Sequence, residues 1–149
     1  MGKKTYYVAA AAVSMIFYAP FAFHLMVLNN PENIIVAFLH NSIKFHHNVS
    51  LTEGQMAIVW ACVVSIFTLG QLIGSIMAPF VADKIGRKPS LGFVATSLSL
   101  VAGVLTFISR PCRSAELLVF GRFVAGIKAG FCCTVAGLYV VELSPAAIR

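Results

Sequence analysis

An all-α membrane protein is the fold class that this sequence predicts, and three observations support it. Hydrophobic residues make up 59% of the 149 residues and charged residues only 11%, which is more apolar surface than a soluble domain could bury. Four apolar stretches reach about 20 residues, the length of a helix that crosses a bilayer. The net charge of +6 comes from Lys and Arg in short groups between these stretches, which is typical of membrane topology and not of a nucleic-acid binder.

Each apolar stretch is predicted to form one transmembrane helix. The four predicted spans cover about residues 6–28, 56–81, 90–109 and 115–141. The first follows Lys3 and Lys4, but it is too long for a signal peptide and no cleavage site follows it. Pro89 suits the first turn of the third helix, Pro111 ends that helix, and Pro145 breaks the fourth.

The basic residues predict the orientation of these four helices. Six basic residues lie on one side of the membrane, before the first span or after the second and fourth spans. They are Lys3, Lys4, Lys84, Arg87, Lys88 and Arg149. The opposite side holds three, namely Lys44, Arg110 and Arg113. Because loops rich in Lys and Arg stay in the cytosol, both termini are predicted to be cytosolic. The Asn48-Val49-Ser50 sequon then lies outside, and Asn48 is a candidate glycosylation site.

A charged turn joins the second and third predicted spans. It reads Asp83-x-x-Gly86-Arg87-Lys88. Gly86 allows a tight turn, and the two basic side chains can bond a helix carbonyl end or a carboxylate. An ordinary positive loop on the cytosolic side is the alternative interpretation.

A second charged segment, Glu142-x-x-Pro145-x-x-x-Arg149, follows the fourth predicted span. Pro145 turns the chain along the membrane surface, which brings Glu142 and Arg149 near Arg87 and Lys88. A charge network between the two cytosolic segments is therefore expected.

Two basic residues lie inside the fourth predicted span. Arg122 is expected to face protein or water, because a charge facing lipid is costly, and we take it as a candidate functional residue. Lys128 lies too near mid-membrane to reach the surface easily. It either lines a water-filled cavity or is a defect tolerated in a chain that no longer transports.

Pairs of glycines four residues apart occur in two of the predicted spans, a spacing that lets another helix approach closely. They are Gly70 and Gly74 in the second span and Gly126 and Gly130 in the fourth. Generic helix packing explains them. With no further helix to fill these grooves, they also suggest binding to a second copy or to a related transporter.

Three motifs follow one another along the chain: the charged turn, Gly121-Arg122 with its following glycines, and the Glu142 segment. Their order resembles that of the sugar porter family of the major facilitator superfamily. Residues 23–32 are similar to a stretch of the animal facilitative glucose transporters. The resemblance implies that residues 1–149 are a partial major facilitator domain, the first part of the N-terminal bundle of a twelve-helix plasma-membrane protein. It implies facilitated diffusion of hexose, with the charged residues of both segments acting in gating.

The resemblance also implies where the sugar binds and how transport is driven. Fifth and sixth spans and a second half are missing, so this chain is expected to hold half a wall of the site and not to transport alone. Polar candidates on that wall are His24, Asn29, Gln71 and Thr134. Proton-coupled sugar porters carry an acidic residue at the position of His24. That residue pairs with an arginine of the fourth span, which Arg122 matches here. No carboxylate lies within a predicted span, so proton coupling is not expected.

Two other classes of protein are weighed against a transporter. A four-span scaffold or a regulatory partner of full-length transporters is the alternative, although Cys132-Cys133 lies within a span and the second outer loop is short, unlike tetraspanins. An enzyme is not expected, because no nucleophile, base and orienting group occur together. The cysteines and histidines lack metal-ligand spacing, so no metal, disulfide or other cofactor is assigned.

Overall fold

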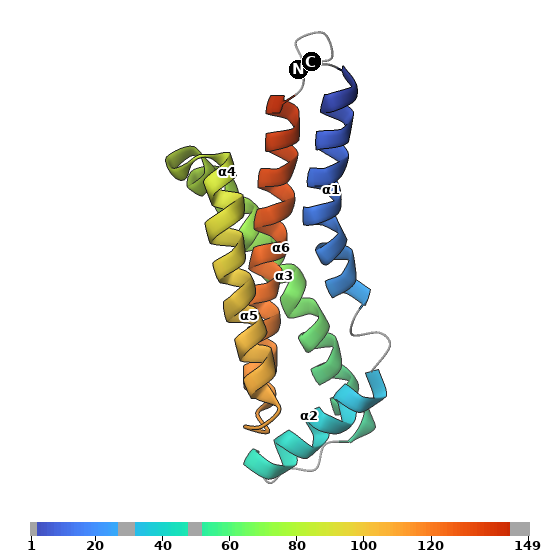
Figure 1. The fold of residues 1–149 in the computed structure, drawn as a ribbon. Helices are drawn as coiled ribbons and strands as arrows, with labels where there is room; N and C mark the ends of the chain where they lie inside the picture. The colour runs from blue at the N-terminus through green and yellow to red at the C-terminus, as the bar shows by residue number, and fades with distance from the viewer. Residues whose placement is uncertain (1–2, 27–31, 48–51, 144–149) are drawn as a thin grey trace.

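The computed structural model describes residues 3–26, 32–47 and 52–143, and every regular element among them is helical (Figure 1). In chain order the elements are α1 (Lys3–Met26), α2 (Glu32–His47), α3 (Glu53–Ile85), α4 (Arg87–Pro89), η1 (Ser90–Val94), α5 (Ala95–Ser109) and α6 (Ala115–Leu143). The short π-helical turn η1 joins α4 to α5, so these three elements follow one another as one helical segment. The all-α class predicted from the sequence is confirmed for the described residues.

Three helical segments of the described residues are long and apolar enough to cross a membrane. They are Glu53–Ile85, Arg87–Ser109 and Ala115–Glu142, with mean hydropathies of 2.1, 2.1 and 1.7. The chain is therefore a multi-pass membrane protein, with three candidate spans where the sequence predicted four. The first predicted span corresponds to α1, a helix of 24 residues. The last two residues of the predicted span, 27 and 28, lie outside the described part of the chain.

The predicted long outer loop after α1 contains the helix α2, which the sequence analysis missed (Figure 1). Leu39 of α2 is fully buried in a cluster with Met56 and Val63 of α3 and Leu118 of α6. Ile35 packs against the same cluster, four residues before Leu39. This i, i+4 repeat was the available signal for an amphipathic helix, but its 16 residues are fewer than a span needs.

The glycine pairs of α3 and α6 pack against each other. A Cβ atom built on any of the four would lie 2.0–2.3 Å from a backbone carbonyl oxygen of the other helix. The positions are Gly70, Gly74, Gly126 and Gly130. Helix packing was predicted for these residues, but the expectation that their grooves are open for a partner chain was wrong, because each pair fills the groove of the other.

Helix α6 lies between the other long helices (Figure 1). On one side Gly121 of α6 approaches Thr106 of α5 closely, since an added Cβ would lie 2.8 Å from the Thr106 hydroxyl. On another side the Tyr18 hydroxyl of α1 donates a hydrogen bond of 3.1 Å to the backbone carbonyl of Cys133. Large apolar side chains such as Phe80 and Phe93 are exposed, as expected for surfaces that face lipid.

Candidate functional site

The charged turn begins where α3 ends, at Gly86. Its backbone N–H donates to the Ala82 carbonyl at 3.0 Å and closes the last turn of α3. Its φ of 94° and ψ of 154° fall in a region that side chains with a Cβ atom avoid. The Ser90 hydroxyl donates to the Gly86 carbonyl at 2.7 Å. The chain reverses at this glycine and places the next residue beside α6.

Arg87 connects two helices through its guanidinium group. Its Nη1 donates to the Asp83 carboxylate of α3, and its Nε donates to Glu142 Oε1 of α6 at 3.0 Å. Lys88 is exposed beside it. Pro145 and Arg149, also predicted for this network, lie outside the described residues. The described contacts join the charged turn to the end of α6, which are 55 residues apart in the chain.

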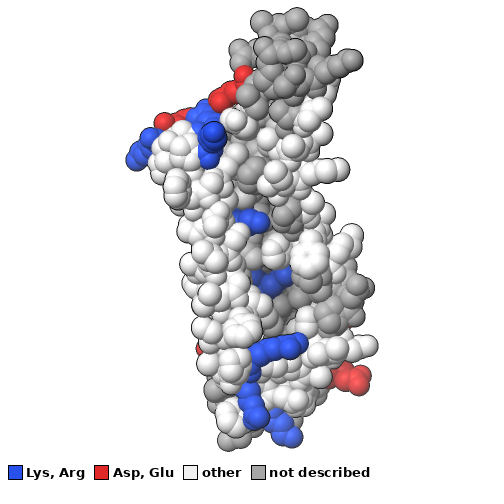
Figure 2. All heavy atoms as spheres, viewed as in Figure 1, with Lys and Arg blue, Asp and Glu red and all other residues white. Residues whose placement is uncertain are grey.

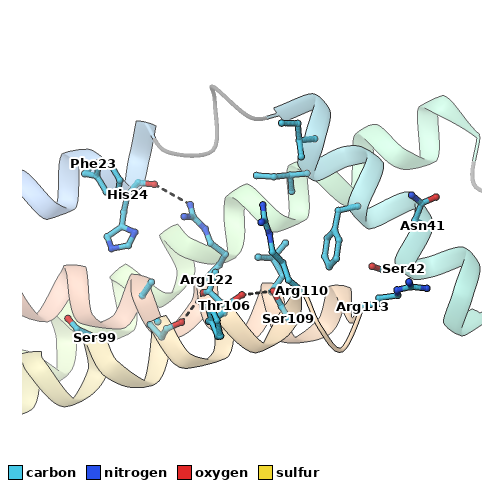
Figure 3. Close-up of a pocket in the computed structure, with 18 of the residues that line it drawn as sticks. Phe23, His24, Asn41, Ser42, Ser99, Thr106, Ser109, Arg110, Arg113 and Arg122 are labelled. Atoms are coloured by element: carbon cyan, nitrogen blue, oxygen red, sulfur yellow. Dashed lines mark hydrogen bonds between the residues drawn. The ribbon is translucent and has the colours of Figure 1, made fainter.

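A large cavity of about 1630 Å³ opens towards the other end of the molecule. Residues of α1, α2, α5 and α6 and of the turn after α5 line it (Figure 3). Aromatic and aliphatic side chains form much of its wall. Its described uncharged polar residues, besides the imidazole of His24, are Asn41, Ser42, Ser99, Thr106 and Ser109. This mixture of apolar and hydrogen-bonding groups is typical of a site for a small polar molecule.

Arg122 lies at the wall of this cavity and is only 7% exposed. Its Nη2 donates a hydrogen bond of 3.3 Å to the backbone carbonyl of His24 in α1 (Figure 3). Its guanidinium carbon lies 5.0 Å from the centroid of the Phe67 ring, a cation–π contact from α3. The buried Nε has no hydrogen-bond partner in the described part of the chain. Arg122 thus contacts both α1 and α3.

Lys128 also lines the cavity and is half-buried. Arg122, Ala125 and Lys128 form an i, i+3, i+6 row along α6, and all three face the cavity. Gly126, by contrast, packs against α3. Of the two interpretations left open by the sequence, the structure places Lys128 on a cavity wall.

Further basic residues surround the end of the cavity near α2. Lys44 comes from α2, and Arg110 and Arg113 come from the turn after α5. The Arg113 guanidinium carbon lies 5.8 Å from the centroid of the Phe45 ring. Figure 2 shows basic atoms within the hollow of this face and acidic atoms towards its two ends. No Asp or Glu occurs among the described residues that line the cavity.

Comparison with known proteins decides the family. A family model described as "Sugar (and other) transporter" matches residues 4–149. The chain belongs to the sugar transporter family. It is 31% identical over 130 residues to solute carrier family 2, facilitated glucose transporter member 7 of Homo sapiens, covering 87% of this chain and 25% of that protein. It is 31% identical over 142 residues to member 3 of Mus musculus, covering 95% of this chain and 29% of that protein.

This sugar transporter chain thus spans less than a third of the length of the relatives that it matches. The relatives are named as facilitated glucose transporters, which are not enzymes. Among the described residues, no three His, Cys, Asp or Glu side chains are placed to hold a metal ion.

The four polar residues predicted for the sugar-binding wall do not all line the cavity. His24 lines the cavity, and Asn29 lies outside the described residues. Gln71 and Thr134 do not line this cavity. The Gln71 backbone packs against Gly130 of α6, and the Thr134 hydroxyl donates to the Gly130 carbonyl at 3.0 Å. Gln71 therefore lies where α3 and α6 pack closely, and the Thr134 hydroxyl is bonded to its own helix.

Sequence analysis missed the polar lining that α2 and α5 supply. Ser99 and Thr106 lie seven residues apart on one face of α5, and Arg113 follows in the turn after that helix. This periodicity was a usable signal. The Thr106 hydroxyl donates to the Ala102 carbonyl at 2.8 Å, so its oxygen can still accept a hydrogen bond from a solute.

Proposed function

We propose that this chain is the N-terminal part of a carrier that moves hexose down its gradient across the plasma membrane. The observation that supports this most is the cavity of about 1630 Å³, which combines apolar walls with hydroxyl, amide and imidazole groups. A monosaccharide needs such a wall, with aromatic faces for its ring and hydrogen-bonding groups for its hydroxyls. Family membership supports the same function, and the relatives' names supply glucose as the first hexose to test.

The proposal includes a partial domain of four spans over residues 1–149, with α1 as the first span. A helix of 24 residues is about 36 Å long, enough to cross the hydrocarbon core. The beginning of α1, the end of α6 and the charged turn lie at one end of the molecule (Figure 1). The basic residues of this end support a cytosolic location under the positive-inside rule. The sequon at Asn48 then lies outside the cell.

The charged segments are proposed to form a gate on the cytosolic side. Arg87 holds the turn between two spans to the end of α6 through Glu142. Exposed ion pairs contribute little to the stability of a fold. Contacts that can break and reform between two helix ends suit a switch between inward- and outward-open states better.

Passive transport is proposed because of the surroundings of Arg122. Proton-coupled sugar porters are expected to bind and release the proton on a carboxylate at the position of His24, opposite Arg122. The described residues that line the cavity include His24 but no carboxylate. The carrier is therefore expected to equilibrate hexose and not to accumulate it.

Uptake of radiolabelled D-glucose tests this function, using proteoliposomes that contain the product of the complete reading frame. We expect saturable uptake that unlabelled D-glucose competes with and that stops at equal concentrations inside and outside. A collapsed pH gradient should not change it. Uptake no faster than in empty liposomes would refute hexose transport, and accumulation that a protonophore abolishes would refute the passive mechanism.

A further inference from the structure

The charge of the cavity exceeds what a neutral sugar requires. Five basic side chains line it, namely Lys44, Arg110, Arg113, Arg122 and Lys128, and its described lining includes no Asp or Glu. Hydroxyl groups of a hexose can be bound by neutral amides, hydroxyls and backbone groups. A cation inside a membrane span is costly and is usually paired. The unbalanced positive charge therefore suggests a ligand that carries negative charge.

Arg122 and Lys128 make this argument strongest, because they lie on a membrane-spanning helix. Arg122 is 7% exposed, and the partners found for it are a backbone carbonyl and the face of an aromatic ring. Its Nε has no hydrogen-bond partner within residues 3–26, 32–47 and 52–143. Neither the carbonyl nor the ring carries a full negative charge. An anion in the cavity would balance the guanidinium where the effective dielectric constant is low.

The approach to these two residues is also basic. Lys44, Arg110 and Arg113 lie near the end of the cavity bounded by α2 and by the turn after α5. Figure 3 shows the side chains of Arg110 and Arg122 projecting into the space between the α5–α6 pair and the α1–α2 pair. Cations along the walls of a cleft raise the local concentration of anions.

We propose that the cavity binds a hexuronate, a six-carbon sugar whose ring carries a carboxylate. Its carboxylate would pair with the guanidinium of Arg122, with Lys128 adding a second positive charge further along α6. The ring hydroxyls would bond Thr106 and the other polar groups of α5 and α2. This inference rests on the proposed function, because it assigns the charge of the solute to the same cavity.

Equilibrium binding of D-glucuronate and D-glucose to the purified product of the complete reading frame tests the inference. The chain is held in nanodiscs of phosphatidylcholine, so that no anionic lipid head group competes for the cavity. We expect the Kd for D-glucuronate to be lower than that for D-glucose by about tenfold or more. The methyl ester of D-glucuronate should bind like D-glucose, because esterification removes only the charge.

Two variants separate the cavity from the general charge of the protein. Lys128→Gln is expected to reduce the preference for D-glucuronate by about tenfold. Lys84→Gln removes the same charge from an exposed position at the cytosolic end of α3 and should leave the preference unchanged. Raising the salt concentration should weaken D-glucuronate binding more than D-glucose binding.

The outcomes distinguish this inference from the proposed function. D-glucose bound as tightly as D-glucuronate, or an ester bound as tightly as the acid, would overturn the inference and leave hexose transport standing. D-glucuronate bound without measurable D-glucose binding would support the inference and count against hexose as the transported solute. Binding of neither sugar would overturn the inference, while the uptake assay would still decide hexose transport.

Discussion

Gly86 ends α3 with a backbone conformation that only glycine adopts readily. The residue that follows it, Arg87, reaches Asp83 and Glu142 because the chain turns at this point. The sequence indicated the turn through the Asp83-x-x-Gly86-Arg87-Lys88 spacing. Which carboxylates Arg87 contacts depends on the packing of α6, which the spacing alone does not contain.

Gly86→Ala should destabilise the protein through backbone strain. The expected loss is about 1–3 kcal/mol in the free energy of unfolding, because the new Cβ atom disfavours a φ of 94°. Gly92→Ala is the matched control, since a Cβ atom there meets no other atom within 4 Å. Thermal unfolding in detergent compares the two variants. Equal melting temperatures would show that Gly86 is not held in this conformation.

Arg87→Glu should shift the complete carrier away from the state in which the gate is closed. The substitution places a carboxylate beside Asp83 and Glu142, so that repulsion replaces the two ion pairs. The measurement is the relative affinity for inhibitors that bind from the inner and outer sides. The double variant with Glu142→Arg restores one pair and should recover part of the shift, whereas unchanged inhibitor preference in Arg87→Glu would exclude a gating role.

At the scale of the elements, the sequence predicted the close packing of helices such as α3 and α6 but not which helices pair, and it did not predict α2. The four spaced glycines predicted close helix packing, and the structure shows it. They could not predict that the two pairs pack against each other, because the pairing of helices is a property of three-dimensional structure. Helix α2 was missed because its amphipathic face buries Leu39 in a helix too short to span the membrane.

Gly74→Ala should weaken the α3–α6 pair. The added Cβ atom would lie 2.1 Å from the Ile127 carbonyl oxygen, a backbone atom that can move only with its helix. Overpacking of this kind costs about 1–3 kcal/mol. Gly54→Ala in the same helix is the control, because it meets no atom within 4 Å. If the Gly74→Ala variant had the same melting temperature as Gly54→Ala, the close packing of α3 against α6 would be contradicted.

At the scale of the whole molecule, the charged turn with its ion pairs lies at one end and a basic cavity opens towards the other. Composition and span length were sufficient to predict a membrane protein. They also predicted all three candidate spans found among the described residues. The cavity could not be predicted from candidate residues alone. His24 lines it, but Gln71 and Thr134 do not, because helix rotation decides which polar residues face a cavity.

The orientation of the molecule gives a further prediction. Epitope tags before Lys3 and after Arg149 should bind antibodies only after the cells are permeabilised, because the excess of basic residues favours a cytosolic location for this end. A tag inserted after Asn48 should bind antibodies in intact cells. Staining of either terminal tag in intact cells would contradict the topology and would move the cavity mouth to the inner side.

Protection of an introduced cysteine by hexose tests most directly whether the cavity holds the solute. Ser99→Cys lies on the cavity wall, and Ser97→Cys lies on the same helix away from it. Both are compared with the parent protein, whose Cys62 and Cys112 are exposed. In the complete carrier, D-glucose should slow alkylation of Ser99→Cys, whereas L-glucose should not, and Ser97→Cys should react equally fast with either sugar. Alkylation of Ser99→Cys at the same rate with and without D-glucose would contradict a hexose site in this cavity.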